Sequence, residues 1–452
     1  MKKQNKKSRL DQFISDPKKA LWNLALPMMF GMSVQAIYML VDTAFVGRWV
    51  GGTGLASLGY VFPYFFIIMG ITFGLGSGST TLIAQKIGAK EKLLAENIAK
   101  HTVFLGLFLG LLILIIGFKG GEKLILIQGA DEKTLKLSLD YFYIMSGGSI
   151  FMVLSIFFRS ILSGEGEMIF PMKILGIGTI LNIILDPIFI SKYQLAGAAI
   201  ATVISQIIVT IIFIYYLLIS RNNYLNINIT EFQFNFSILK EIFRLGIPAS
   251  LSMIIMSIGI LLFNLILGST EIVAAYQTAG RIEHLFFLPI ISIATSLVTL
   301  VGMFYGAKRI ELIKEIIIYG ISRSVIISLS FSIFFWFTGG FFIPMFSDNS
   351  SIIEYSVTYF KIMAFAYPFI TIGMTCSRIM QGLGHSKPML ILTLLRVIFI
   401  SVSLAWILVN IFKYPPYFAW YGTLISCIIT SLISLSWLKI ILKRSINQIN
   451  TI

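Results

Sequence analysis

Long uninterrupted apolar stretches dominate this sequence and decide what it can fold into. Each can form a helix of about 20 residues, the length that crosses a hydrocarbon core of about 30 Å. With 57% hydrophobic and only 12% charged residues among 452, the chain has more apolar surface than one soluble core can bury. The sequence therefore predicts an all-α integral membrane protein with twelve transmembrane helices. The predicted spans begin near Leu21, Leu55, Thr102, Leu139, Met172, Ala196, Leu239, Val273, Ile317, Ile353, Met389 and Phe418.

The chain has a formal net charge of +15, and the placement of its basic residues gives that charge a meaning. Most of the 35 lysines and arginines fall on the side that holds both chain ends and the loops after the even-numbered spans. Basic residues collect on the cytoplasmic side of membrane proteins. We therefore expect both termini in the cytoplasm, a multi-pass protein of the cell membrane, and the lipid bilayer rather than nucleic acid as the partner of this charge.

Two halves of the chain match at a constant offset. Gly88-Ala89 corresponds to Gly306-Ala307, and Tyr141-Phe142 corresponds to Tyr359-Phe360, each 218 residues later. Six spans per half give both halves the same orientation, which predicts two six-helix lobes related by a pseudo-two-fold axis along the membrane normal. The expected parts are a cytoplasmic tail, an N-lobe, a polar linker that lets the lobes move, a C-lobe and a second cytoplasmic tail, at residues 1–19, 20–219, 220–236, 237–442 and 443–452.

Two carboxylates interrupt the apolar spans of the first half. Asp42 lies near the end of the first span with Gln35 and Tyr38 on the same helical face, and Asn182 and Asp186 share a face of the fifth span. An ionisable side chain within a span costs roughly 2.5 kcal/mol or more at its centre and usually marks a functional site. Because this half has no lysine or arginine inside a span, the cluster could bind a proton, a sodium ion or an amine. The alternative is a set of structural hydrogen bonds within the bundle.

A third interior carboxylate, Glu283, occurs in the eighth span next to Arg281 and His284. It could contact a cationic substrate, or it could belong to a polar patch that satisfies itself. The sequence leaves both interpretations open.

These residues and motifs resemble the multidrug and toxic compound extrusion (MATE) transporters, and among them the DinF-like prokaryotic branch. The resemblance covers the whole chain. The parts that carry it are Leu26-Pro27, Val41-Asp42-Thr43, Gly47, the Gly88-Ala89 loop, the Leu162 to Gly166 loop and Asn182-Ile-Ile-Leu-Asp186-Pro187.

The resemblance implies a secondary antiporter that exports organic cations and drugs, driven by a proton or sodium gradient. It implies a cation-coupling site of Asp42, Asp186, Asn182, Gln35 and Tyr141, with sodium as a possible occupant of the first three. It implies that Glu283, Asp186 and Tyr38 bind the substrate. No cofactor other than H⁺ or Na⁺ is expected, and the expected partners are small organic cations and the bilayer, with the chain a monomer.

The sequence also bears on a second ion site, on related flippases and on an enzymatic function. Another branch of the family has acidic residues in spans seven and ten, where this chain offers Asn264 and Ser377, so an ion site of that kind is not expected. Related flippases for lipid-linked or polysaccharide precursors remain the alternative, although only Arg281 and Arg396 could give their usual cationic lining. An enzyme is not expected, because the three histidines lie in separate parts of the chain and no His-Glu-x-x-His motif occurs.

Overall fold

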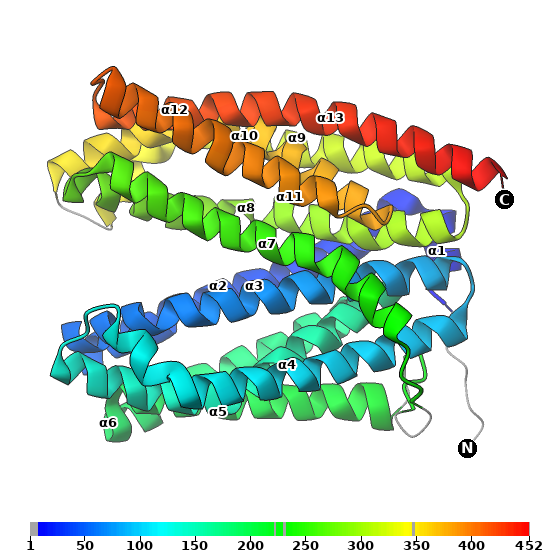
Figure 1. The fold of residues 1–452 in the computed structure, drawn as a ribbon, viewed down its shortest axis with the longest axis horizontal. Helices are drawn as coiled ribbons and strands as arrows, with labels where there is room; N and C mark the ends of the chain where they lie inside the picture. Colours follow the sequence, from blue (N-terminus) through cyan, green and yellow to red (C-terminus); the bar gives the residue numbers. More distant parts are fainter. Residues whose placement is uncertain (1–7, 221–222, 229–231, 346–348, 452) are drawn as a thin grey trace. The chain divides into compact units, whose positions relative to one another are not determined.

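The computed structural model describes residues 8–220, 223–228, 232–345 and 349–451, and its regular elements in these ranges are helical. Figure 1 shows their arrangement. Residues 221–222 and 229–231 of the expected linker and residues 1–7 of the expected tail lie outside the described ranges. The long helices are α2 (Pro17–Trp49), α3 (Gly52–Gly88), α4 (Lys92–Leu126), α5 (Glu132–Glu165), α6 (Ile169–Ile214), α7 (Phe236–Leu267), α8 (Thr270–Gly306), α9 (Ile310–Phe342), α10 (Ser350–Gly382) and α13 (Ala419–Thr451).

Several helical segments continue or precede these helices. A π-helical turn, η1 (Tyr215–Ile219), extends α6. The eleventh span alternates between α-helical and π-helical backbone. Its parts are α11 (Lys387–Leu394), η4 (Leu395–Val402), α12 (Ser403–Trp406) and η5 (Ile407–Ile411).

Eleven helices of the described chain are long and apolar enough to cross a membrane. One of them, Ile169–Ile219, holds two spans, because Gln194 has the non-helical angles φ 52° and ψ −131°. Close packing at this break requires Gly197, where an added Cβ would lie 2.2 Å from the carbonyl oxygen of Phe189. Twelve spans result, which confirms the predicted all-α membrane fold with six spans in each half of the sequence.

The described chain forms two compact units that do not divide at the linker alone. Of the described residues, unit 1 contains Ser8, Arg9 and those within Phe30–Gly246, and unit 2 contains Leu10–Met29 and those from Ile247 onward. The first part of α2 therefore belongs with the second half of the sequence, and the first turns of α7 belong with the first half. The two changes of unit that fall inside long helices each lie within three residues of a proline, Pro27 in α2 and Pro248 in α7.

Small and hydroxylic residues let the helices of unit 1 approach closely. Helix α5 packs against α3, α4 and α6. In α3, the Thr80 hydroxyl donates to the carbonyl oxygen of Ser160 at 2.8 Å, and a Cβ added at Gly76 would lie 2.3 Å from the Ser160 hydroxyl. The Gly74 to Thr81 run thus provides close packing and interhelical hydrogen bonds between α3 and α5.

Unit 2 has an aromatic core between α8, α9, α10 and α13. The rings of Phe335 and Phe360 stack with centroids 4.7 Å apart, and the buried Trp420 meets the ring of Tyr359 edge-on at 5.3 Å. Aromatic pairs at these separations stabilise a core beyond their area burial. Tyr359 of this core also donates a hydrogen bond to Glu283.

The ends of the described chain are helical and partly packed. A short helix, α1 (Leu10–Ser15), buries Leu10 and Phe13 in unit 2 and contacts α8. Lys18 pairs with Glu315 at 3.3 Å. At the other end, α13 continues to Thr451, so the stretch expected as a C-terminal tail extends the last helix.

Candidate transport site

The two aspartates of unit 1 are buried on different helices. Asp42 on α2 is 8% exposed, and Asp186 on α6 is fully buried, close enough for their charges to interact. Within the described part of the chain, one oxygen of each carboxylate, Oδ1, is buried without a hydrogen-bond partner. A buried carboxylate oxygen without a partner is costly when the group is charged. The structure therefore brings together two groups that each favour an added proton or cation.

Thr202 connects the polar side chains around these aspartates. Its hydroxyl lies 3.1 Å from the Tyr38 hydroxyl. In the amide orientation that satisfies both neighbours, Asn182 donates to Asp186 Oδ2 at 2.8 Å and accepts from the backbone N–H of Thr202 at 3.2 Å. The network thus includes the sixth span through a threonine that the sequence does not single out. A single hydroxyl in an apolar span is too common to have marked the site.

Tyr141 lies near the same cluster, and Gln35 lies on the helix that carries Asp42. Tyr141 on α5 is buried, and its hydroxyl is close enough to Asp42 and Asp186 for electrostatic interaction. Gln35 is half-buried on α2, two helical turns before Asp42. Helices α2, α5 and α6 therefore bring Asp42, Tyr141 and Asp186 close together, whereas the participation of Gln35 stays a prediction.

Neither aspartate has a cationic partner among the described residues. The ion pairs found there involve other carboxylates, and no cluster of three or more His, Cys, Asp or Glu side chains with metal-binding geometry occurs in these ranges. Asp42 and Asp186 could contribute carboxylate oxygens to a sodium ion, but the carbonyl oxygen of Asn182, the third expected ligand, already accepts from the Thr202 N–H in the satisfied orientation. The arrangement provides carboxylates whose charge is compensated only when an external cation arrives.

Glu283 in unit 2 has a different environment. The Tyr359 hydroxyl donates to Glu283 Oε2 at 2.5 Å, and the Arg396 guanidinium is close enough to act on the carboxylate electrostatically. Arg281 and His284, its neighbours in sequence, are exposed instead. The polar partners of Glu283 therefore come from α10 and the eleventh span, and not from the residues next to it.

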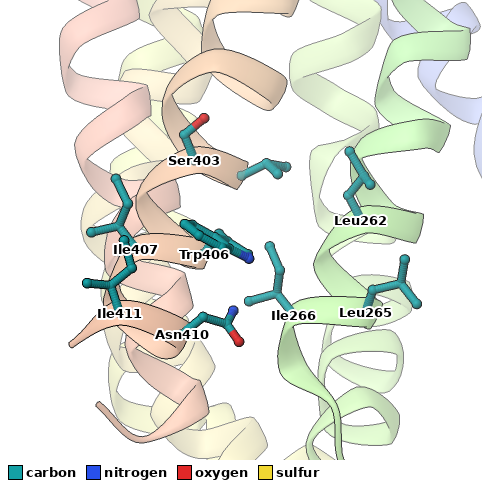
Figure 2. A pocket seen from close by; sticks show the side chains of 9 residues that line it. Leu262, Leu265, Ile266, Ser403, Trp406, Ile407, Asn410 and Ile411 are labelled. Atoms are coloured by element: carbon teal, nitrogen blue, oxygen red, sulfur yellow. The ribbon is translucent and has the colours of Figure 1, made fainter. Parts of the chain in front are cut away.

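A groove of about 620 Å³ lies between α7 and the eleventh span of unit 2. Figure 2 shows the ring of Trp406 and the amide of Asn410 facing Leu262 and Ile266 across it. None of its nine lining residues is charged. The groove offers aromatic, aliphatic and amide contact, but recognition of a charge would have to come from elsewhere in the protein.

Carboxylates buried within the spans of a twelve-span helical protein are the mark of a membrane transporter. The comparison with known proteins is more specific. The MatE family profile matches residues 27–188 and 248–407. The chain therefore belongs to the MatE family of transporters.

Similar proteins and solved structures match most of the chain. The probable multidrug resistance protein NorM of Thermotoga maritima is 25% identical over 93% of this chain and 92% of its own length. The multidrug export protein MepA of Staphylococcus aureus is 27% identical over 84% of each chain. The crystal structure of MATE in the bent conformation superposes with a TM-score of 0.93 at 30% identity, covering 98% of this chain and 100% of that one.

The family assignment confirms the resemblance found in the sequence and the prediction of a transporter rather than an enzyme. The roles of Asp42, Asp186, Asn182, Gln35, Tyr141, Tyr38 and Glu283 stay predictions, as do the coupling ion and the transported compound.

Proposed function

We propose that this protein is a secondary antiporter that exports organic cations, including drugs, across the cell membrane in exchange for an inward proton. The observation that carries the proposal is the pair Asp42 and Asp186, buried in the spans with an unpaired oxygen each and no described cationic partner. Two such carboxylates cannot both ionise at low cost, so one proton is shared or retained by the pair. Multidrug export by the relatives named above supports organic compounds as the cargo.

A proton suits the site better than sodium. A cation held by protein oxygens needs several ligands at once. Asn182 commits its carbonyl oxygen to the Thr202 N–H in the satisfied orientation. The two carboxylates and the Tyr38 and Tyr141 hydroxyls then remain, which is enough to hold a proton by hydrogen bonds and few for a sodium ion.

Export follows if proton and substrate exclude one another. A positively charged substrate near Asp186 and Tyr38 favours the ionised aspartates, and a proton arriving at the pair removes that attraction. Glu283 of unit 2, which accepts a hydrogen bond from Tyr359, provides a further negative charge that attracts the substrate. Release of the substrate on the outer side is therefore linked to uptake of a proton on the same side.

The expected topology places both termini in the cytoplasm and the chain in the membrane as a monomer of two lobes. Lys133 is exposed at the start of α5, and Gln233 is exposed in the linker. In intact cells an impermeant thiol reagent should label Lys133→Cys and spare Gln233→Cys. Equal labelling of both would contradict the orientation.

Export of lipid-linked or polysaccharide precursors is less well supported. A pyrophosphate head group would need free cationic side chains. Arg396 acts on Glu283 and on Cys427 instead.

Uptake of a fluorescent organic cation into inside-out vesicles tests the function. A proton gradient alone should drive uptake by the wild-type protein, and Asp42→Asn and Asp186→Asn should abolish it. Asp140→Asn, which changes an exposed aspartate on α5, is the matched control. Uptake driven only by a sodium gradient would show that sodium, and not the proton, is the coupling ion. Full activity of both aspartate variants would show that Asp42 and Asp186 have only a structural role.

A further inference from the structure

We infer that His101, Glu96 and Glu165 form a receptor on unit 1 that holds the segment between the two halves and positions the start of α7, so that the halves hinge within α7 and not in the linker. The argument uses the described residues 223–228 and 232–235 of that segment. Each of the three side chains accepts a hydrogen bond from a backbone N–H of this segment.

His101 is the central member of this receptor. It lies on α4 and is fully buried. The backbone N–H of Asn235 lies 2.7 Å from His101 Nε2, and His101 Nδ1 lies 2.8 Å from the carbonyl oxygen of Asn97. Because a backbone N–H only donates, Nε2 must be the unprotonated acceptor, and Nδ1 must carry the hydrogen that is donated to Asn97. Both ring nitrogens are therefore used in one defined tautomer.

Two glutamates hold the other end of the segment. Glu165 Oε1 accepts from the N–H of Leu225, and Glu96 Oε1 accepts from the N–H of Asn226, each at 2.8 Å. Leu225 is fully buried and Ile227 is 2% exposed. Backbone amides outside a helix need a partner when they are buried, and here side chains of α4 and α5 provide it. The segment is fixed by recognition of its main chain.

Aromatic rings pack around His101 and add to this docking. The ring of Phe232 lies 4.9 Å from the imidazole, and Phe104 of α4 stacks on Phe232 at 5.7 Å. Phe234 meets Phe104 edge-on at 5.8 Å. Contacts of this geometry favour one position of the segment over a set of loose ones.

The same contacts decide where α7 begins. Asn235 caps α7, since its side-chain oxygen accepts from the N–H of Ser237 at 2.9 Å and its carbonyl oxygen accepts from Ile238 at 3.1 Å. The remaining backbone group of Asn235, its N–H, is the one bound to His101. His101 is therefore a positioning residue for the first turn of α7.

The first turns of α7 pack tightly within unit 1. A Cβ added at Gly78 of α3 would lie 2.7 Å from the carbonyl oxygen of Ile242, and one added at Gly246 would lie 2.6 Å from the Cα of Leu75. Backbones this close leave little room for sliding. Unit 1 ends at Gly246, and Pro248 follows, where the missing N–H leaves the Arg244 carbonyl without its helical partner. Movement of one half against the other is absorbed at Gly246 to Pro248.

Hydrogen exchange of the full-length protein in nanodiscs, read by mass spectrometry without substrate or ion gradient, tests this inference. In the wild type the amides of Leu225, Asn226 and Asn235 should exchange at least tenfold more slowly than free peptide. His101→Leu should lose the protection around Asn235, whereas His101→Gln should retain most of it, because an amide can both accept from Asn235 and donate to Asn97. Gln233→Leu, which changes an exposed side chain of the same segment, is the matched control.

Transport should follow the exchange. His101→Leu should lower the maximal rate several-fold with the KM for substrate unchanged, and His101→Gln should restore it. Should His101→Leu fail to fold, Glu96→Leu must still speed exchange at Asn226. Free-peptide exchange of the wild-type amides, equal loss in His101→Leu and His101→Gln, or unchanged protection in the folded leucine variants would each overturn the inference. The exchange readouts do not depend on which ion or compound is carried, so they can fail or hold independently of the proposed function.

Discussion

In both units the carboxylates lie near tyrosines that occupy equivalent places in the repeat, but only the carboxylate of unit 2 has a positive charge close to it. Tyr359 donates directly to Glu283, and the positive charge of Arg396 acts on the same carboxylate. Its counterpart Tyr141 lies near two aspartates that have no described cationic partner and keep an unpaired oxygen each. One scaffold thus provides a compensated carboxylate and an uncompensated pair. Under the proposed function, Glu283 only attracts the substrate, whereas the uncompensated pair also couples transport to the ion.

The largest effect should come from the uncompensated pair. Asp186→Asn or Asp42→Asn removes a group that changes its charge, so proton-driven export should fall by at least 100-fold while the protein still inserts. Vesicle uptake normalised to protein abundance measures this. Asp140→Asn should keep wild-type uptake, and a loss of less than threefold in both site variants would remove the contrast between the units.

Glu283→Gln should have a smaller effect of a different kind. Loss of one partly compensated negative charge should weaken binding of a monovalent organic cation about tenfold, which is roughly 1.4 kcal/mol, and leave proton coupling intact. Equilibrium binding to the purified protein gives the affinity. A neutral substrate should bind the variant as tightly as the wild type, and an unchanged affinity for the cation would make Glu283 a structural residue.

Removing the compensating cation should act in the opposite direction. In Arg396→Gln the charge on Glu283 is no longer opposed, so the same organic cation should bind about threefold more tightly, or roughly 0.7 kcal/mol. Arg396→Lys, which keeps the charge, should bind as the wild type does. Weaker binding in Arg396→Gln than in Arg396→Lys would show that Arg396 serves packing and not compensation.

The smallest effect is expected from the tyrosines themselves. Tyr359→Phe removes one hydrogen bond to a carboxylate and should weaken cation binding only about two- to fivefold, because the tyrosine acts on the cation through Glu283 and not by direct contact. Tyr141→Phe should leave cation binding within twofold and change the pH dependence of transport instead. The same cation affinity and the same pH dependence of transport in both variants would mean that Tyr359 and Tyr141 have the same role in their units.

The sequence predicted the spans well because each is a long apolar run, and it located Asp42, Asp186 and Glu283 because an ionisable group stands out in such a run. The partners of these groups were harder to predict. Tyr359 is 76 residues from Glu283, and Thr202 is one hydroxyl among many. Only the packing of helices distant in sequence selects these residues from the many alike.

The connection between the halves illustrates the same limit. A polar, asparagine-rich stretch is typical of a mobile linker, and the sequence between the halves predicts one. Its described part is held by Glu96, Glu165 and His101, which lie 60 to 134 residues away. These side chains bind main-chain amides, which any sequence carries. The pattern of the linker therefore contains no sign of its docking.

Proton release on substrate binding is the most direct test of the contrast between the two units. Purified protein in weakly buffered detergent solution is mixed with a monovalent organic cation while a pH indicator records the protons released. We predict about one proton per substrate bound for the wild type and for Glu283→Gln at saturating substrate, and none for Asp42→Asn or Asp186→Asn. Undiminished release from both aspartate variants, or its loss only in Glu283→Gln, would contradict the assignment of coupling to Asp42 and Asp186.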